Sequence, residues 1–313
     1  MPDEPELKLN KPWLIAVWPG MGQVAISAGY YLMAKLGMHA IAEFSPRDLF
    51  DAEHIEVSGG LIRLGRMPRS RFFVASDADG RKHDIVLFIG EAQPPQGKYA
   101  FCQRLIEYAK GLGVERVFTF ASMATQMHPT HRSRVFGAAT DPDSLAEFKR
   151  LEVELLEDGH ISGLNGLLLG VSAELGVRGA CLLGEIPHIF AQLPFPKAAL
   201  AVLETFTTLA GIEIDFSELT EQAAAVDHQL GELLAQLEAP IERQAPADEE
   251  EPEDYKPVEE ERLSPADKDR IEQLFEQAQR DRSKAYELKR ELDRLKVFAD
   301  YEDRFLDLFK KPE

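Results

Sequence analysis

One stretch near the start of the chain, Trp13–Gly37, restricts the fold more than any other part of the sequence. Its first six residues, Trp13–Trp18, are almost all apolar and rich in β-branched and aromatic types, which is typical of a strand covered on both faces. Pro19 and two glycines then end the strand. A segment of helical length and composition follows and ends at Gly37, a suitable C-cap. Strand, glycine turn and helix in this order indicate an open α/β sheet.

The glycine turn itself has two interpretations. Gly20-Met21-Gly22-Gln23-Val24-Ala25 fits the G-x-G-x-x-A pattern of a dinucleotide site, and Glu43 follows at the distance where such a site binds a ribose. Small residues are also needed wherever a strand turns tightly into a packed helix, whatever is bound there. A lone glycine pattern does not separate these interpretations, and the structural one has the stronger support.

The segment up to residue 238 alternates strands and helices and predicts one three-layer α/β domain of mixed, mostly parallel strands. Apolar runs that predict further strands lie at His39–Phe44, Asp84–Gly90, Arg116–Ala121, Val135–Thr140 and Gly179–Glu185. Helices are predicted at Tyr99–Leu112, Asp141–Leu151, Leu167–Leu175 and Pro196–Leu209. Two extended segments, Ile55–Leu64 and Arg71–Ser76, predict a hairpin.

Ligands of open α/β sheets bind beyond the carboxyl ends of the strands, so the residues at those ends define a candidate binding site. It combines the turn at Gly20–Gly22 and a second glycine-rich turn at Gly163–Gly166 with polar side chains that follow buried strands. The residues are Gly20, Met21, Gly22, Glu91, Ser122, Gly163, Asn165, Gly166 and Glu185. Both glycine turns precede helices, whose N-termini favour anions.

The sequence predicts no catalytic residue, no cofactor and no metal site. His128 and His131 flank a proline that breaks helical spacing, and no nearby Cys or acidic residue completes a zinc set. Nucleophile-elbow and phosphate-loop patterns are absent from the sequence. Glu91 and Glu185 can share acid–base work only if the fold brings them within about 10 Å.

Charge indicates which partners to expect, and cysteine content indicates the cellular compartment. The formal net charge of −19 argues against nucleic acids and anionic membrane surfaces. No apolar run reaches membrane-spanning length, and the N-terminus lacks the features of a signal peptide. Two cysteines, Cys102 and Cys181, cannot form a disulfide framework and fit buried thiols in a reducing compartment. A cytoplasmic protein is therefore expected.

Residues 239–263 are predicted to be a disordered acidic linker, because residues 242–262 hold ten acidic against three basic residues and few apolar side chains. A heptad-patterned helix is predicted on either side of this linker. The stripe before it contains Leu219, Val226, Leu230, Leu233 and Leu237. The stripe in residues 264–313 contains Ile271, Leu274, Leu288, Leu292 and Leu295, with Asp281 as its one polar break. Each stripe needs a partner, within the chain or in another subunit.

Several of these segments together resemble the proteasome assembly chaperone 2 family over about Lys11–Leu237. They occur in the same order as in that family, and their order is more specific than any one of them. The segments are Trp18–Ala25, Phe44–Pro46, Gly59–Ile62, Gly90–Pro94, Gly163–Gly170, Leu183–Glu185, Pro196–Ala199 and Leu209–Ile212. The acidic linker and terminal helix are similar to the bacterial branch.

The resemblance implies a phosphorylase/hydrolase-like α/β fold, self-association into a homo-oligomer, and binding to other proteins, such as proteasome subunits or another complex. Family members that dock on proteasomes use a C-terminal hydrophobic-Tyr-any motif, whereas this chain ends Phe309–Glu313 without it. The family resemblance and the lack of a catalytic set of residues in the sequence favour a non-catalytic, assembly-chaperone-like interaction protein. The alternative is an enzyme that binds a nucleoside, nucleotide or other anion in a phosphorylase-like cleft, with both glycine turns as anion cradles.

Overall fold

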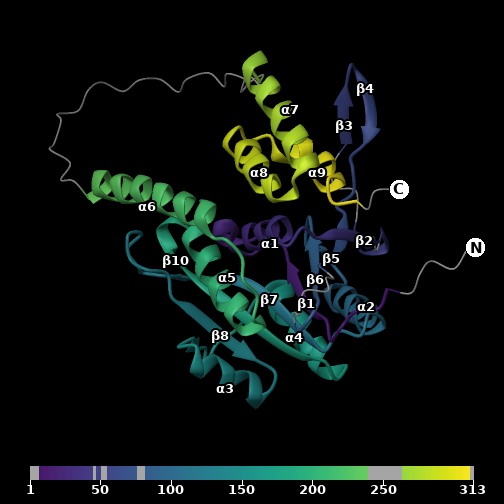
Figure 1. The fold of residues 1–313 in the computed structure, drawn as a ribbon, viewed down its shortest axis with the longest axis vertical. Coiled ribbons are helices and arrows are strands. Elements are labelled where there is room, and N and C mark those ends of the chain that lie inside the picture. Colours follow the sequence, from purple (N-terminus) through teal and green to yellow (C-terminus); the bar gives the residue numbers. More distant parts are fainter. Residues whose placement is uncertain (1–6, 45–46, 51–54, 76–81, 239–262, 311–313) are drawn as a thin grey trace, which may run out of the picture.

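A mixed eight-stranded sheet forms the centre of the computed structural model, which describes residues 7–44, 47–50, 55–75, 82–238 and 263–310 (Figure 1). Its strand order is β2-β5-β6-β1-β7-β10-β8-β9. The central four strands run parallel, whereas β5 and β8 pair antiparallel to them. The strands are β1 (Trp13–Val17), β2 (His39–Phe44), β5 (Ser70–Ala75), β6 (Ile85–Gly90), β7 (Arg116–Thr125), β8 (Val135–Ala139), β9 (Glu154–Leu155) and β10 (Arg178–Pro187).

Helices cover both faces of this sheet, and the alternation of side chains along β1 separates two apolar cores. Ile15 and Val17 pack in the core under α1 (Val24–Lys35) and α5 (Pro196–Ala210). Leu14 and Ala16 pack in the core under α2 (Lys98–Gly111) and α4 (Gly163–Glu174). A further helix, α3 (Pro142–Arg150), packs on β8. The predicted three-layer α/β fold with a mixed, mostly parallel sheet is confirmed.

The predicted hairpin between Ile55–Leu64 and Arg71–Ser76 is wrong. Instead, β3 (Ile55–Ser58) and β4 (Leu61–Leu64) pair with each other and form a separate two-stranded sheet. The turn between them contains Gly59 and Gly60, both with positive φ, so a tight hairpin closes inside the first predicted segment. The other segment, β5, joins the main sheet between β2 and β6.

The heptad stripe before the linker lies on one helix, α6 (Ser217–Glu238), which packs on α5. Leu219 and Leu230 are buried, Val226 is half-buried, and Leu233 is 40% exposed. The side chain of Leu237 lies outside the described residues. The predicted acidic linker lies there too, except for its last residue, Leu263. Most of this stripe is thus covered by the chain's own domain.

The single helix predicted for residues 264–313 is replaced by three helices, α7 (Pro265–Arg280), α8 (Ala285–Arg294) and α9 (Phe298–Asp307). Asp281, the polar break in the heptads, is extended, and its carboxylate accepts a hydrogen bond from the amide of Ser283, which starts the next helical turn. Lys296 adopts a left-handed conformation after α8 and ends it. The heptad spacing continues through Asp281 and Lys296, so the apolar pattern alone does not reveal that helices end there.

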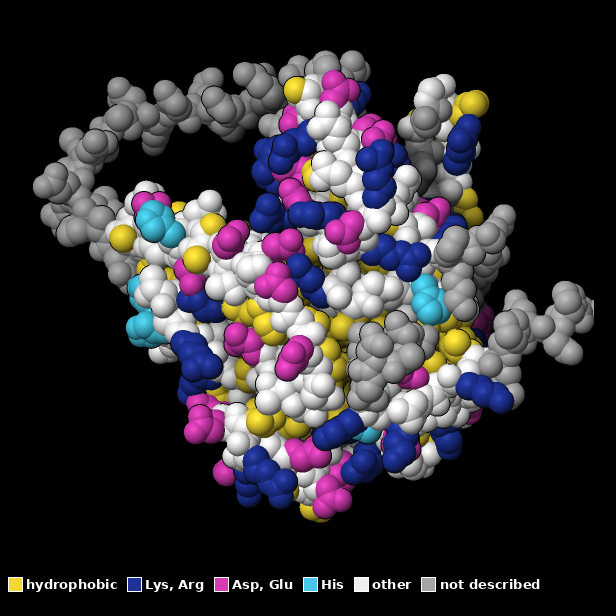
Figure 2. Space-filling model, viewed as in Figure 1, with side chains coloured by type: hydrophobic (Ala, Val, Ile, Leu, Met, Phe, Trp, Pro, Cys, Tyr) yellow, Lys and Arg dark blue, Asp and Glu magenta, His cyan; other side chains and the backbone are white. Residues whose placement is uncertain are grey.

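These three helices pack on α1 rather than forming a coiled coil with α6. Ile271, Leu274, Leu288 and Leu292 are at most 4% exposed and join the core that contains α1, and Leu295 packs against that core. Figure 1 places α7–α9 beside α1, and Figure 2 shows acidic and basic side chains intermingled on their outer surface. The second stripe is therefore covered within one chain.

Candidate functional site

The first glycine turn is held by the chain's own backbone. The Gly22 amide donates to the Ala191 carbonyl at 2.7 Å, and the Phe195 amide donates to the Gly22 carbonyl at 2.9 Å. Gly22 has a φ of +61°, and a Cβ there would lie 3.3 Å from Ile186. Ser122 donates its hydroxyl to the Met21 carbonyl. Close packing and a left-handed conformation explain the glycine at position 22.

The second glycine-rich turn is also closed by neighbouring protein groups. The side chain of Gln93 accepts a hydrogen bond from the Leu164 amide at 3.1 Å, so it occupies the N-terminus of α4. A Cβ on Gly166 would lie 2.1 Å from the Ile161 carbonyl oxygen, and one on Gly163 would lie 2.8 Å from Gln93. The Asn165 carbonyl accepts a hydrogen bond from Thr119. An anion at this turn would have to displace Gln93.

Glu185, on β10, is a buried carboxylate fixed by an arginine. Arg134 donates to its two oxygens at 2.6 and 2.8 Å, and Thr125 donates to it at 2.7 Å. These hydrogen bonds, led by those from Arg134, lower the pKa of Glu185 despite its burial. His188 lies close by, with Nδ1 3.0 Å from the Thr125 carbonyl. Because Glu185 stays ionised and paired, it is poorly suited to exchange protons near neutral pH.

The other strand-end carboxylate, Glu91, follows β6 and belongs to a different group of side chains. The strands β1 and β7 lie between β6 and β10, so the Glu91 and Glu185 backbones are separated by three strand spacings, roughly 14 Å. His128 contacts Thr130, and its ring lies 5.4 Å from the ring of His131 at an angle of 47°. The structure therefore keeps the candidate acid–base residues apart.

Glu91 joins what we call the arginine–carboxylate cluster, which comprises Arg66, Arg69, Arg71, Glu91, Glu302 and Asp303. Arg66 and Arg71 contact the Glu91 carboxylate at 3.1 and 3.3 Å, and the Arg69 amide donates to it at 2.8 Å. Arg71 also donates to Asp303 of α9 at 2.6 Å. The cluster thus connects the end of β6 to the C-terminal helices. No local sequence pattern predicts the cluster, because its members come from three distant segments.

Tyr30 of α1 completes the inner side of this cluster. Its hydroxyl donates to Glu302 at 2.8 Å. Burial, with added repulsion from Glu91, raises the pKa of Glu302. Burial and the neighbouring Glu302 also raise the pKa of Tyr30. Here the helix α9 places a carboxylate where its charged form is disfavoured.

A cleft of about 840 Å³ lies next to the cluster, between α1, α6, α8 and α9. We call it the interhelical cleft. Its apolar walls come from Ile26, Leu193, Pro194, Val226, Leu230 and Phe298. Lys289 lies within it, 4% exposed, and contacts Asp293 at 2.6 Å as well as the rings of Tyr30 and Phe298. Its size and apolar walls suit a ligand or a protein segment.

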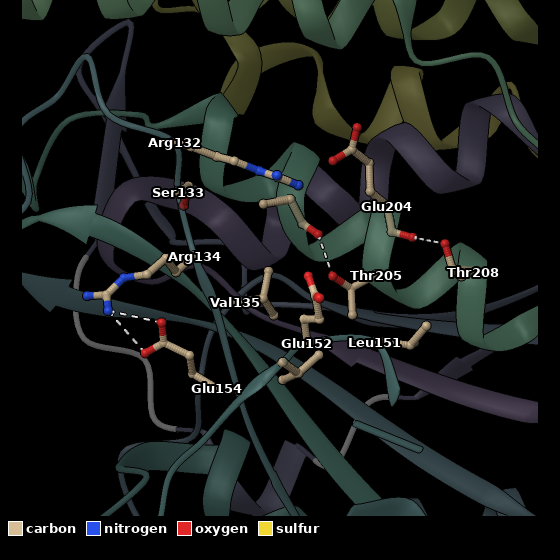
Figure 3. Close-up of a pocket in the computed structure, with 12 residues that line it drawn as sticks. Arg132, Ser133, Arg134, Val135, Leu151, Glu152, Glu154, Glu204, Thr205 and Thr208 are labelled. Atoms are coloured by element: carbon tan, nitrogen blue, oxygen red, sulfur yellow. Dashed lines mark hydrogen bonds and ion pairs between the residues drawn. The ribbon is translucent and has the colours of Figure 1, made fainter. Parts of the chain in front are cut away.

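A smaller, polar pocket of about 340 Å³ lies between β8, β9 and α5 (Figure 3). Arg134 pairs there with Glu154 at 3.0 Å, while the Thr205 and Thr208 hydroxyls donate to backbone carbonyls of α5. Figure 3 shows Arg132 and Glu204 above Val135, and the Arg134–Glu154 pair to its left. Both hydroxyls are thus occupied by hydrogen bonds within the helix.

No three His, Cys, Asp or Glu side chains among the described residues are grouped so that they could hold a metal ion. No helix in the described part of the chain has the length and apolar character needed to cross a membrane.

Comparison with known proteins gives a family match that covers most of the chain. The sequence model of the PAC2 family matches residues 14–234. An uncharacterized protein of Methanocaldococcus jannaschii, MJ1210, is 30% identical over 144 residues, which is 46% of this chain and 54% of that protein. The match thus spans about half the length of this relative. The helices α7–α9 lie beyond the end of the family match.

Solved structures of two Pyrococcus furiosus proteins are similar to this one. The archaeal proteasome activator PbaB is 27% identical, with a TM-score of 0.61 over 75% of this chain and 96% of that one. PbaA, described as an archaeal homolog of proteasome-assembly chaperone, is 25% identical, with a TM-score of 0.57 over 74% of this chain and 91% of that one. Both matches cover nearly all of the compared protein.

Proposed function

Because the chain belongs to the PAC2 family, we propose that it acts as a chaperone-like, non-catalytic protein that associates with itself and binds subunits of another protein complex. The described strand ends support this proposal. Glu91 and Glu185 are each paired with arginines, and both glycine turns are closed by backbone or side-chain groups of the same chain. That use of the strand ends for internal contacts is the observation that carries the proposal.

Proteasome subunits are the first partner to test, because the similar structures include a proteasome activator and a homolog of proteasome-assembly chaperone. The full chain is mixed with purified proteasome subunits, and native mass spectrometry measures the complexes formed. We expect a saturable complex of defined stoichiometry. If no complex forms with any of the subunits at tens of micromolar, proteasome subunits are not the partner.

The interhelical cleft supports a second candidate function, the binding of a small molecule. Its volume of about 840 Å³ and apolar walls lie in the range of ligand pockets. Thermal-shift measurements with nucleosides, nucleotides and phosphate distinguish the two functions. The non-catalytic proposal predicts no saturable shift. A shift that disappears when Val226→Trp fills the cleft would favour the small-molecule function.

Gly22 is a poor position for a variant that tests small-molecule binding. Replacing Gly22 by valine forces a β-branched residue into a φ of +61° and against Ile186, so the fold itself would suffer. Val226 is half-buried on α6 and lines the interhelical cleft, so its replacement by Trp is the better test.

A further inference from the structure

The hairpin of β3 and β4 carries an apolar face that the described part of the chain leaves uncovered. The two strands pair only with each other, in a sheet separate from the main one (Figure 1). In their register Ile55 lies opposite Leu64, and Val57 lies opposite Ile62. Because opposite residues of an antiparallel pair share a face and neighbours alternate, these four side chains lie on the same face. We call it the hairpin face.

All four side chains of the hairpin face are more than half exposed. The exposed fractions are 55% for Ile55, 66% for Val57, 71% for Ile62 and 67% for Leu64. Single exposed aliphatic residues are common, but four adjacent ones approach the size of the largest patch on a typical monomer, roughly 300–600 Å². Such patches mark interaction surfaces. A two-stranded hairpin is also only marginally stable alone in water, so a covering layer would stabilise it.

We propose that the hairpin face is a self-association surface and that its occupant is the hairpin face of a second copy. This inference rests on the proposed function, which includes self-association, and it adds where the contact is made. In a two-fold contact the same surface serves both copies, so the surface must match itself. A flat face of Val, Ile and Leu side chains does so, because sheets pack face to face through interdigitating apolar residues.

The distribution of charge supports a second copy of the chain as the occupant of the hairpin face. The chain carries −19 overall, so two copies repel each other over most of their surfaces. The segment 55–66 holds one acidic residue, Glu56, and two basic ones, Arg63 and Arg66, which gives +1. The four positions of the hairpin face hold no charged residue. Two copies that meet there bury no like charges against each other.

The size of the surface sets the strength expected of the contact. Two faces of roughly 300–600 Å² bury about 600–1,200 Å² together, which is at or below the low end for specific complexes. The association should therefore depend on protein concentration in the micromolar range. Additional contacts between the two copies elsewhere would strengthen the association. The experiment therefore compares variants of the hairpin face with the wild type.

The experiment measures the molar mass of the full chain by size-exclusion chromatography with light scattering over a range of concentrations. We expect the wild-type mass to rise from that of one 35.0 kDa chain toward a multiple of it. Val57→Asp with Ile62→Asp should weaken association at least tenfold, because it places charges in the contact. Leu61→Asp is the matched control: Leu61 is 62% exposed on the opposite face of the same strand, and its variant should associate like the wild type.

A cross-linking measurement identifies the occupant. Cys102 and Cys181 are both 0% exposed, so in Ile62→Cys a thiol-specific bismaleimide reacts at the new cysteine. Position 62 should cross-link to position 62 of a second copy. Cross-links from position 62 to a different surface would overturn the two-fold contact.

The failures of the two proposals are distinguishable. A wild-type chain that stays at one chain mass at all concentrations would overturn both self-association and this contact. If the wild type associates and Val57→Asp with Ile62→Asp associates equally well, the hairpin contact is wrong while self-association stands. Circular dichroism verifies that each variant is folded before its mass is interpreted.

Discussion

At the scale of single residues, buried carboxylates decide how the strand ends are used. Glu185 is 2% exposed, and Arg134 neutralises it from a position that is itself half exposed. The same guanidinium contacts Glu154, which is 44% exposed at its side chain. One arginine thus bridges a buried and an exposed carboxylate, and the two contacts should differ in energy because only one carboxylate is removed from water.

Replacing Glu185 by Gln should lower the free energy of unfolding by about 1–3 kcal/mol at pH 7, because it removes charged hydrogen bonds inside the protein. Glu154→Gln is the matched control on the same arginine, and it should cost about 0–1 kcal/mol. Urea denaturation followed by circular dichroism measures both values. Equal costs for the two variants would contradict a structural role specific to the buried carboxylate.

The contribution of Glu185 should also depend on pH. Its pKa in the folded chain is lower than the usual Glu value of about 4.3, so the folded state binds its proton less readily than the unfolded state. The stabilisation is fully present above pH of about 4.3 and is lost as pH falls through the folded pKa. The stability difference between wild type and Glu185→Gln should shrink on acidification. A difference that grows below pH of about 4 would oppose this account.

At the scale of elements, the sequence predicted those parts whose signals are local. The buried strand around Ile15 and the helix after Gly22 follow from an apolar run and a glycine break. The hairpin β3–β4 was not predicted, because Ile55–Leu64 reads as one extended segment although its Gly59-Gly60 turn closes a hairpin within it. The three C-terminal helices were read as one because the heptad spacing passes through Asp281.

The arginine–carboxylate cluster could not be predicted, because it depends on tertiary contacts. Arg71 and Asp303 are separated by 232 residues and meet only when α9 packs beside β5 and β6. Sequence identifies the charges but gives no distance between them. For the same reason, Arg134 was not recognised as the partner of Glu185.

Neutralising each of two neighbouring residues of α9 should lower the free energy of unfolding at Asp303 but not at Glu302. Asp303→Asn removes the contact with Arg71 and should lower the free energy of unfolding by about 1 kcal/mol. Burial alone would raise the pKa of Asp303, but Arg71, Arg66 and Arg69 lower it, so its charge is stabilising. Glu302→Gln keeps a partner for Tyr30 and removes a charge that burial and Glu91 disfavour. This variant should be as stable as the wild type or more stable.

The pH dependence of Glu302 follows from its raised pKa. Since the folded state binds this proton more readily than the unfolded state, the wild type loses stability relative to Glu302→Gln as pH rises through the folded pKa. Denaturation of both proteins between pH 5 and 9 measures the change. A wild type that gains relative stability with rising pH would show that Glu302 is held mainly by Arg66 and Arg71.

At the scale of the whole molecule, the C-terminal helices belong to the same core as α1 although the family match ends before them. Phe275, Phe305 and Phe309 are 0% exposed and lie in the core cluster that also contains Tyr30 and Tyr31. The Tyr286 hydroxyl hydrogen-bonds to Gln222 of α6. The chain therefore fastens α7–α9 by apolar burial, by the arginine–carboxylate cluster and by this contact with α6.

These contacts predict that the covalent connection through residues 239–262 is not needed to keep α7–α9 bound. A protease site inserted there allows the purified chain to be cut after folding. The fragment that contains α7–α9 should then co-elute with the rest on size exclusion, because apolar burial on α1 holds it. Phe305→Asp places a charge in that contact and should release the fragment after the same cleavage, whereas Asp300→Asn, at an exposed position of α9, should not. If the wild-type fragment separates at micromolar concentration, the C-terminal helices are held mainly by their connection to the chain, and the core they share with α1 contributes little to their binding.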